Sequence, residues 1–111
     1  MAYQAILGMG SRNVTTAGTQ LPLVATPTFV RSLVIQARRG NTQAVYIGTS
    51  AIDNATGISL LAGETLAYDG PRDKHGVSST FNLADIYVDS NINGEGVTFI
   101  YSVDSYNQHT F

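Results

Sequence analysis

Short runs of β-branched and aromatic residues, each bounded by Gly, Asn or Asp, recur along this chain and constrain its fold more than any other feature. Gly and Pro punctuate the sequence, and signals for an amphipathic helix are nearly absent. The sequence therefore predicts an all-β fold. The strongest strand candidates are Ser32 to Arg38, Gln43 to Thr49, Ile58 to Leu61, Ala84 to Asp89 and Val97 to Val103.

Two weaker strand candidates, Tyr3 to Gly8 and Leu21 to Ala25, precede these five. A chain of 111 residues supports one domain, here residues 1–111, and has no room for a second. Short strands separated by turn signals, with no helix between them, are typical of a sandwich and not of alternating β and α units. We therefore expect a single-domain antiparallel β-sandwich with a jelly-roll-like layout.

Alternating apolar side chains indicate which strand faces form the core. Successive side chains of a strand point to opposite faces, so one face of Val97 to Val103 is apolar and the other is mixed. The strand Ser32 to Arg38 divides in the same way. We expect the core to contain Val97, Phe99, Tyr101 and Val103 together with Leu33, Ile35 and Ala37.

Gly and Asn tolerate the positive φ angles of tight turns, so several short segments are predicted to be turns. Arg39-Gly40-Asn41 is predicted to join its two flanking strands as a hairpin. Gly8-Met9-Gly10 resembles a fragment of a phosphate-binding loop, but no helix follows it, so it is interpreted as a turn. Three longer segments lack strand character: residues 9–20, the loop 67–82 and the C-terminal tail 104–111. Loops of this length are commonly functional. We expect them to form the contact surface, through Arg12, Asn13, Arg72, Lys74, His75, Tyr106 and Phe111.

The chain carries little charge, which bears on its partners. Charged residues make up 13% of the sequence and the formal net charge is -2, so no basic field exists to attract nucleic acid. A polar but uncharged surface suits contact with other protein, and we expect a homo-oligomer. No stretch approaches the length of a membrane span, and the start of the chain lacks the pattern of a secretory signal. We expect no membrane partner and no leader.

The segment Asp89 to Gly94 is the sharpest motif in the chain. It fits the first half of a calcium loop, with oxygen-bearing side chains at alternate positions and Gly at the turn. The bidentate Glu that such a loop needs six residues beyond its glycine is replaced by Ile100. We interpret the segment as a hairpin loop between two strands, and a calcium site is the alternative.

Candidate catalytic groups are few. Only His75 and His109 are available as bases, and neither lies in a predicted strand. No spacing fixes two carboxylates across a cleft, and there is no cysteine. We expect no catalytic residues, no metal, no cofactor and no enzymatic activity.

Three segments carry a resemblance to a known family: SLVIQARRGNTQAVYIG from Ser32, GISLLAGETL from Gly57 and LADIYVDSNINGEGVTFIYSV from Leu83. Their order is similar to that of small capsid decoration proteins of tailed bacteriophages, and chain length and layout most resemble the staple or cement proteins of epsilon-fifteen-like short-tailed phages. The resemblance implies a jelly-roll protein, made in the cytoplasm of a bacterial host, that binds the outer capsid surface of the virion. It also implies a dimer that clamps neighbouring subunits of the major capsid protein.

Two other roles are compatible with the same sequence. One is a tail or baseplate adaptor, and the other is a virion-displayed carbohydrate-binding module. Copy number per particle separates the first from a decoration protein, and glycan binding by the isolated protein separates the second.

Overall fold

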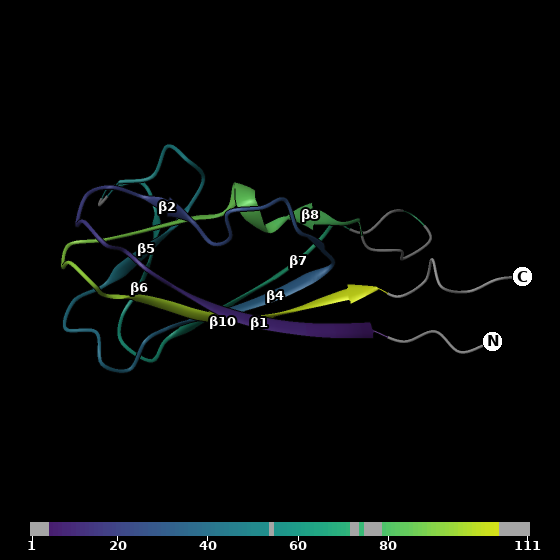
Figure 1. The fold of residues 1–111 in the computed structure, drawn as a ribbon, viewed down its shortest axis with the longest axis horizontal. Coiled ribbons are helices and arrows are strands. Elements are labelled where there is room, and N and C mark those ends of the chain that lie inside the picture. The colour runs from purple at the N-terminus through teal and green to yellow at the C-terminus, as the bar shows by residue number, and fades with distance from the viewer. Residues whose placement is uncertain (1–4, 54, 72–73, 75–78, 105–111) are drawn as a thin grey trace, which may run out of the picture.

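Two four-stranded antiparallel sheets form a sandwich in the computed structural model of this protein (Figure 1). The structure describes residues 5–53, 55–71, 74 and 79–104. The expected all-β antiparallel sandwich is confirmed. Its elements are β1 (Ala5–Asn13), β2 (Leu21–Pro22), β3 (Phe29–Val30), β4 (Ser32–Ala37), β5 (Val45–Gly48), β6 (Ile58–Leu60), β7 (Thr65–Asp69), β8 (Phe81–Asn82), a 3-10 turn η1 (Leu83–Asp85), β9 (Tyr87–Ser90) and β10 (Gly96–Asp104).

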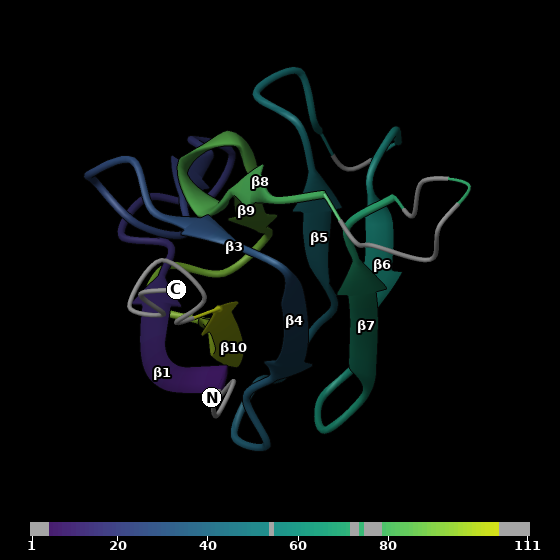
Figure 2. The ribbon, with the colours of Figure 1, turned by 90° about the vertical axis from the view of Figure 1, so that its right-hand side faces the viewer.

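The strand order shows that neighbours in space are distant in sequence. The first sheet has the order β1-β10-β4-β7 and the second has the order β2-β9-β5-β6, while β3 and β8 form a separate short pair. Every pair is antiparallel. Figure 2 shows the first sheet running across the molecule from β1 through β10 and β4 to β7. β1 and β7 are therefore the edges of this sheet.

The core lies between the two sheets and follows the predicted alternation. In β4, Leu33, Ile35 and Ala37 are buried while Val34 is exposed. In β10, Val97 and Phe99 are buried and Tyr101 and Val103 pack against the core, as expected. The second sheet contributes Val45, Ile47 and Val88 from the opposite side. Burying each such side chain contributes about 1.5–3 kcal/mol, which stabilises a chain that has no disulfide.

The prediction that residues 9–20 are irregular is wrong for their first part. Met9 to Asn13 belong to β1, which pairs with β10 along its whole length. A side chain at Gly8 or Gly10 would run into the ring of Tyr101 or Phe99, so the two glycines let these rings cover the strand. Gly8-Met9-Gly10 is therefore a strand segment and not a turn, and the irregular part begins after Asn13.

The predicted hairpin at Arg39-Gly40-Asn41 is also wrong. β4 pairs with β10 on one side and β7 on the other, so no edge of β4 remains for β5. Residues 38–44 instead carry the chain from the first sheet to the second. The segment Asp89 to Gly94 begins inside β9 and makes the reverse crossing after Ser90 towards β10, so it is likewise not a hairpin.

Two other segments differ in part from expectation. The predicted loop 67–82 begins inside β7 and ends with β8, so its first and last residues belong to strands, while residues 72–73 and 75–78 lie outside the described part of the chain. The predicted tail 104–111 starts with the last residue of β10, and its remaining residues lie outside the described part of the chain. The start of the predicted strand Ala84 to Asp89 is the turn η1, because Asn82 caps it through its side chain.

Candidate interaction surface

The face of the first sheet that points away from the core, here called the outer face, is the most distinctive surface of the described chain. The registers of β1, β10, β4 and β7 align their outward side chains in three rows across the sheet. The middle row contains Met9, Ile100, Val34 and Ala67. The rows beside it contain Leu7, Ser102, Ser32 and Asp69 on one side and Ser11, Thr98, Gln36 and Thr65 on the other.

The middle row forms an apolar stripe that is open to solvent. Met9 is 78% exposed, and Ile100 and Val34 are 43% and 41% exposed. Leu7, in the next row, is 68% exposed. A shallow depression of about 340 Å³ lies along the stripe. Exposed apolar residues are ordinary when scattered, but a contiguous group rimmed by polar residues marks a site of protein contact.

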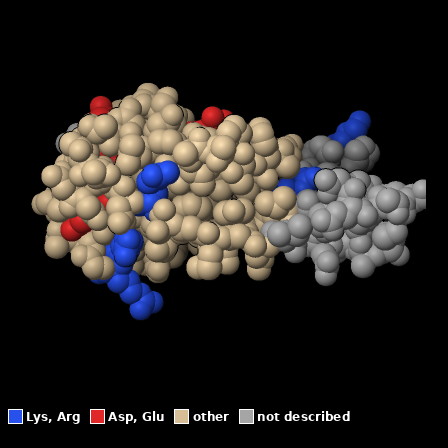
Figure 3. Space-filling view, in the orientation of Figure 1, with Lys and Arg blue, Asp and Glu red and all other residues tan. Residues whose placement is uncertain are grey.

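The outer face is almost free of charge. Asp69, on the edge strand β7, is the only ionisable residue in the three rows. The flanking rows consist mainly of Ser, Thr and Gln, and the hydroxyls of Ser32 and Ser102 hydrogen-bond to each other across β4 and β10. Figure 3, which views the molecule from the side of β1, shows few charged residues over its middle. Such a face packs against protein without desolvating ions, which is the costly part of burying a polar surface.

Charged groups in the crossing loops serve the fold. Glu95 accepts hydrogen bonds from the backbone and hydroxyl of Thr42, both at 2.7 Å, and from the backbone of Gln43 at 3.2 Å. The Thr42 hydroxyl, followed by these backbone groups, lowers the pKa of Glu95 below its ordinary value. This carboxylate ties together the two segments that cross between the sheets.

Two side chains of the calcium-like motif, Asp89 and Asn93, accept hydrogen bonds from backbone N–H groups. Asp89 is 4% exposed, and its Oδ1 accepts from the N–H groups of Ser90 at 2.8 Å and Gly18 at 3.1 Å. Asn93 Oδ1 accepts from the N–H of Ala17 at 2.7 Å. These bonds hold the loop after β1 against the crossing from β9 to β10. The arrangement explains the motif as a structural clamp.

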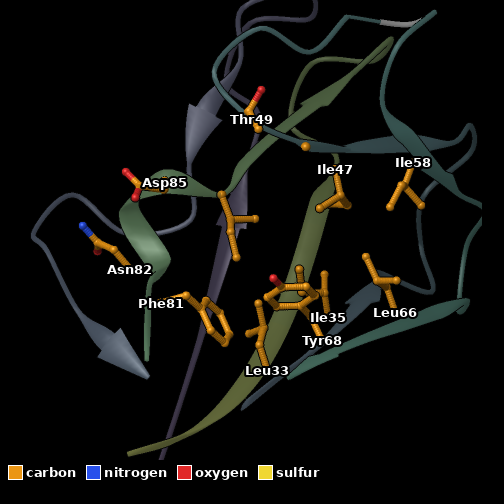
Figure 4. Close-up of a pocket in the computed structure, with 12 residues that line it drawn as sticks. Leu33, Ile35, Ile47, Thr49, Ile58, Leu66, Tyr68, Phe81, Asn82 and Asp85 are labelled. Carbon is orange, nitrogen blue, oxygen red and sulfur yellow. The ribbon is translucent and has the colours of Figure 1, made fainter. Parts of the chain in front are cut away.

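An apolar pocket of about 290 Å³ opens between the sheets beside β6 and β7 (Figure 4). Leu33, Ile35 and Ile47 line it, and Ile58 and Tyr68 are about half exposed. Tyr68 packs edge-to-face against Phe81, with ring centroids 4.9 Å apart. The pocket can accept an apolar group. Asp85 is the one carboxylate among the described residues that line it, and Asn82 Oδ1 accepts from the N–H groups of Thr28 and Ala84.

The structure separates the predicted contact residues that it describes. Arg12 is half-buried in β1, and Asn13 accepts a hydrogen bond from Arg38 Nη1 at 2.8 Å. Lys74 is exposed in the connection that leaves β7 at Asp69, and the register places Asp69 at the opposite end of the sheet from Asn13. Arg72, His75, Tyr106 and Phe111 lie outside the described residues.

The sequence interpretation missed the outer face, although a signal for it was present. Leu7 and Met9 alternate with Gly8 and Gly10 in the period of two that marks a strand. Gly8-Met9-Gly10 is nevertheless interpreted as a turn, because no helix follows it to complete a phosphate-binding loop. Val34 and Ile100 alternate with the predicted core residues of their strands and therefore lie on the opposite face, but no local pattern connects that face with β1.

Comparisons with protein-family models, with curated proteins and with solved structures found no match to this chain. Within the described ranges, no group of three or more His, Cys, Asp or Glu residues is placed to hold a metal ion. The same ranges contain no helix that is long and apolar enough to cross a membrane. The outer face therefore remains the feature on which a functional proposal can be built.

Proposed function

We propose that this protein is a non-enzymatic component of a virion that decorates the head of a tailed bacteriophage and clamps neighbouring subunits of the major capsid protein. The observation that carries the proposal is the outer face: an apolar stripe of Met9, Ile100, Val34 and Ala67, flanked by uncharged polar residues. A flat face of this kind offers area and shape for contact with protein and offers no chemistry.

The strand order supports a jelly roll as the specific form of the sandwich. In a jelly roll of eight strands the first pairs with the last, the second with the seventh, the third with the sixth and the fourth with the fifth. Without the short pair β3 and β8, the present order gives β1 with β10, β2 with β9, β4 with β7 and β5 with β6. We infer that the chain has this topology, which is common among capsid proteins.

A clamp fits the energetics of a shell. Each decorating copy adds buried area at a joint between capsid subunits, and ligands that bind only the assembled state stabilise it by mass action. Repetition over the shell multiplies a modest energy per copy. The low charge of the outer face favours this binding, because the face can approach the large surface of the capsid without electrostatic repulsion.

Binding to stripped heads tests this proposal. Heads of the phage that carries this protein, freed of it and then mixed with labelled protein, should bind hundreds of copies and resist heat or osmotic shock better than undecorated heads. Ile100→Lys should lose binding, because it places a charge in the middle of the stripe. Leu61→Lys, at a residue that is 59% exposed outside the outer face, should bind normally and serves as the matched control.

Other outcomes would redirect the assignment. Copies that number in the tens and locate to the tail would favour an adaptor, and binding to glycans by the isolated protein would favour a carbohydrate-binding module. Equal binding by Ile100→Lys and the unmodified protein would remove the outer face from the interface.

A further inference from the structure

β1 is an edge strand with an open row of backbone hydrogen-bonding groups. Val14 N donates to Glu95 O at 2.8 Å and Gly94 N donates to Val14 O at 2.7 Å, so the backbone groups of Val14 face the β10 side. These groups alternate in direction along a strand, so those of Arg12, Gly10 and Gly8 also face β10. The groups that point away from β10 belong to Ala5, Leu7, Met9, Ser11 and Asn13.

This edge lacks most of the devices that usually prevent pairing. Proteins protect edge strands with proline, lysine, bulges, inward-pointing charges or very short length, and of these β1 has only the half-buried Arg12 near its end. β1 has nine residues in unbroken register with β10, with neither proline nor lysine, and its only charged residue is Arg12. Leu7 and Met9 stand exposed on the same edge. The strand is thus a ready template for another strand.

We propose that β1 pairs antiparallel with β1 of a second copy about a twofold axis at Met9, which joins two four-stranded sheets into one sheet of eight strands. In this register Met9 lies opposite Met9 of the second copy and Leu7 lies opposite Ser11. The backbone N–H and C=O groups that point away from β10 then form hydrogen bonds with the same groups of the second copy. Full pairing forms about ten backbone hydrogen bonds, the number that a standard protein interface carries in total.

The charge pattern permits this register. Arg12 lies six residues from its counterpart along the paired strands, a distance of roughly 20 Å at the rise of an extended strand. This is about twice the screening length at physiological salt, so the two guanidinium groups do not repel appreciably. No other ionisable residue lies on β1, and the neighbouring outward residues of β10 are Thr98, Ile100 and Ser102.

The pairing also aligns the apolar stripes of the two copies. Because Met9 is the end of the middle row, the row continues from Val34 and Ile100 through both Met9 residues into the same row of the second copy. A twofold axis therefore doubles the length of the stripe. The pairing concerns the edge of the sheet and does not depend on what the outer face binds.

Sedimentation of the isolated protein with two matched variants tests the proposal. Met9→Pro removes an N–H that points away from β10, so the β1–β10 ladder stays intact while pairing at the centre of the edge is blocked. Ile100→Lys adds a charge to the outer face but leaves the edge unchanged. We expect a dimer for the unmodified protein and for Ile100→Lys, and a monomer for Met9→Pro at the same micromolar concentration.

Two results would overturn the proposal. One is a monomeric unmodified protein at these concentrations; the other is a dimer that Ile100→Lys dissociates and Met9→Pro does not, which would indicate packing through the outer faces. Sedimentation of the isolated protein does not depend on whether stripped heads bind it. The test of dimerisation is therefore independent of the test of the proposed function.

Amide hydrogen exchange of the unmodified protein gives an answer even if Met9→Pro does not fold. In a dimer paired through β1, the amides of Leu7, Met9 and Ser11 exchange slowly at high concentration and rapidly on dilution. Those of Gly8 and Gly10 stay protected throughout, because they bond to β10. Rapid exchange of Leu7, Met9 and Ser11 at every concentration would exclude the pairing.

Discussion

Replacing Asp89 with Ala should destabilise the protein by about 2–3 kcal/mol, because this buried carboxylate satisfies backbone N–H groups that have few other partners. Ser90 N–H donates to Asp89 Oδ1 and would be left without it. Gly18 N–H loses less, since it also donates to Ser90 O at 3.1 Å. An orphaned buried N–H costs about 1–3 kcal/mol, and the weakened second bond adds a smaller amount.

Thermal and urea denaturation of Asp89→Ala measure this cost. For a domain of this size, 2–3 kcal/mol corresponds to a fall in Tm on the order of 10 °C. Asp89→Asn keeps an oxygen at the Oδ1 position and should lose about half as much. Asp69→Ala, at an exposed residue, should stay within about 0.5 kcal/mol of the unmodified protein. A loss below about 1 kcal/mol for Asp89→Ala would refute the assignment of this residue as a structural clamp.

Three further predictions concern the loops. Glu95 has a lowered pKa, so its contribution to the free energy of unfolding is complete above the ordinary value of 4.5 and disappears as the pH falls through the lower folded value. The difference in stability between the unmodified protein and Glu95→Gln should therefore stay constant from about pH 5 to 7 and disappear in acid. Denaturation at several pH values measures this difference. Gly63→Ala should destabilise the protein by about 1 kcal/mol, because Gly63 has φ +82°. Gly40 has no positive φ and open space around it, so Gly40→Ala should be neutral or slightly stabilising. Equal effects of the two variants in chemical denaturation would contradict this prediction. Millimolar calcium or a chelator should leave Tm unchanged, because the oxygens of Asp89 and Asn93 already accept backbone N–H groups, and a rise of several degrees with calcium would restore the metal interpretation.

Strands with one apolar face were predictable from the sequence, and their partners were not. Ser32 to Arg38 and Val97 to Val103 show a clear period of two because one face of each packs in the core. In β1 the period of two is harder to recognise, since its inward positions include Gly8 and Gly10, which the rings of Tyr101 and Phe99 cover. β1 is a strand because it pairs with β10, which lies near the other end of the sequence, and no local sequence pattern indicates such a distant partner.

The two mistaken hairpins have a common physical cause. A turn rich in Gly and Asn specifies that the chain bends, but not whether the next strand returns to the same sheet. In this fold the strands before both turns already have their neighbours, so the chain crosses to the opposite sheet each time. The outer face could not be predicted for the same reason: local patterns do not specify which strands are neighbours, and the face forms only when β1, β10, β4 and β7 lie side by side.

A reconstruction of the decorated phage head, at a resolution that separates strands, would test the proposed role most directly. We expect density for this protein on the outside of the shell. The outer face of β1, β10, β4 and β7 should lie against the major capsid protein, and the crossing loops that contain Asp89 and Glu95 should lie away from that contact. Density on the tail, or on the head with Met9, Val34 and Ile100 facing solvent, would contradict it.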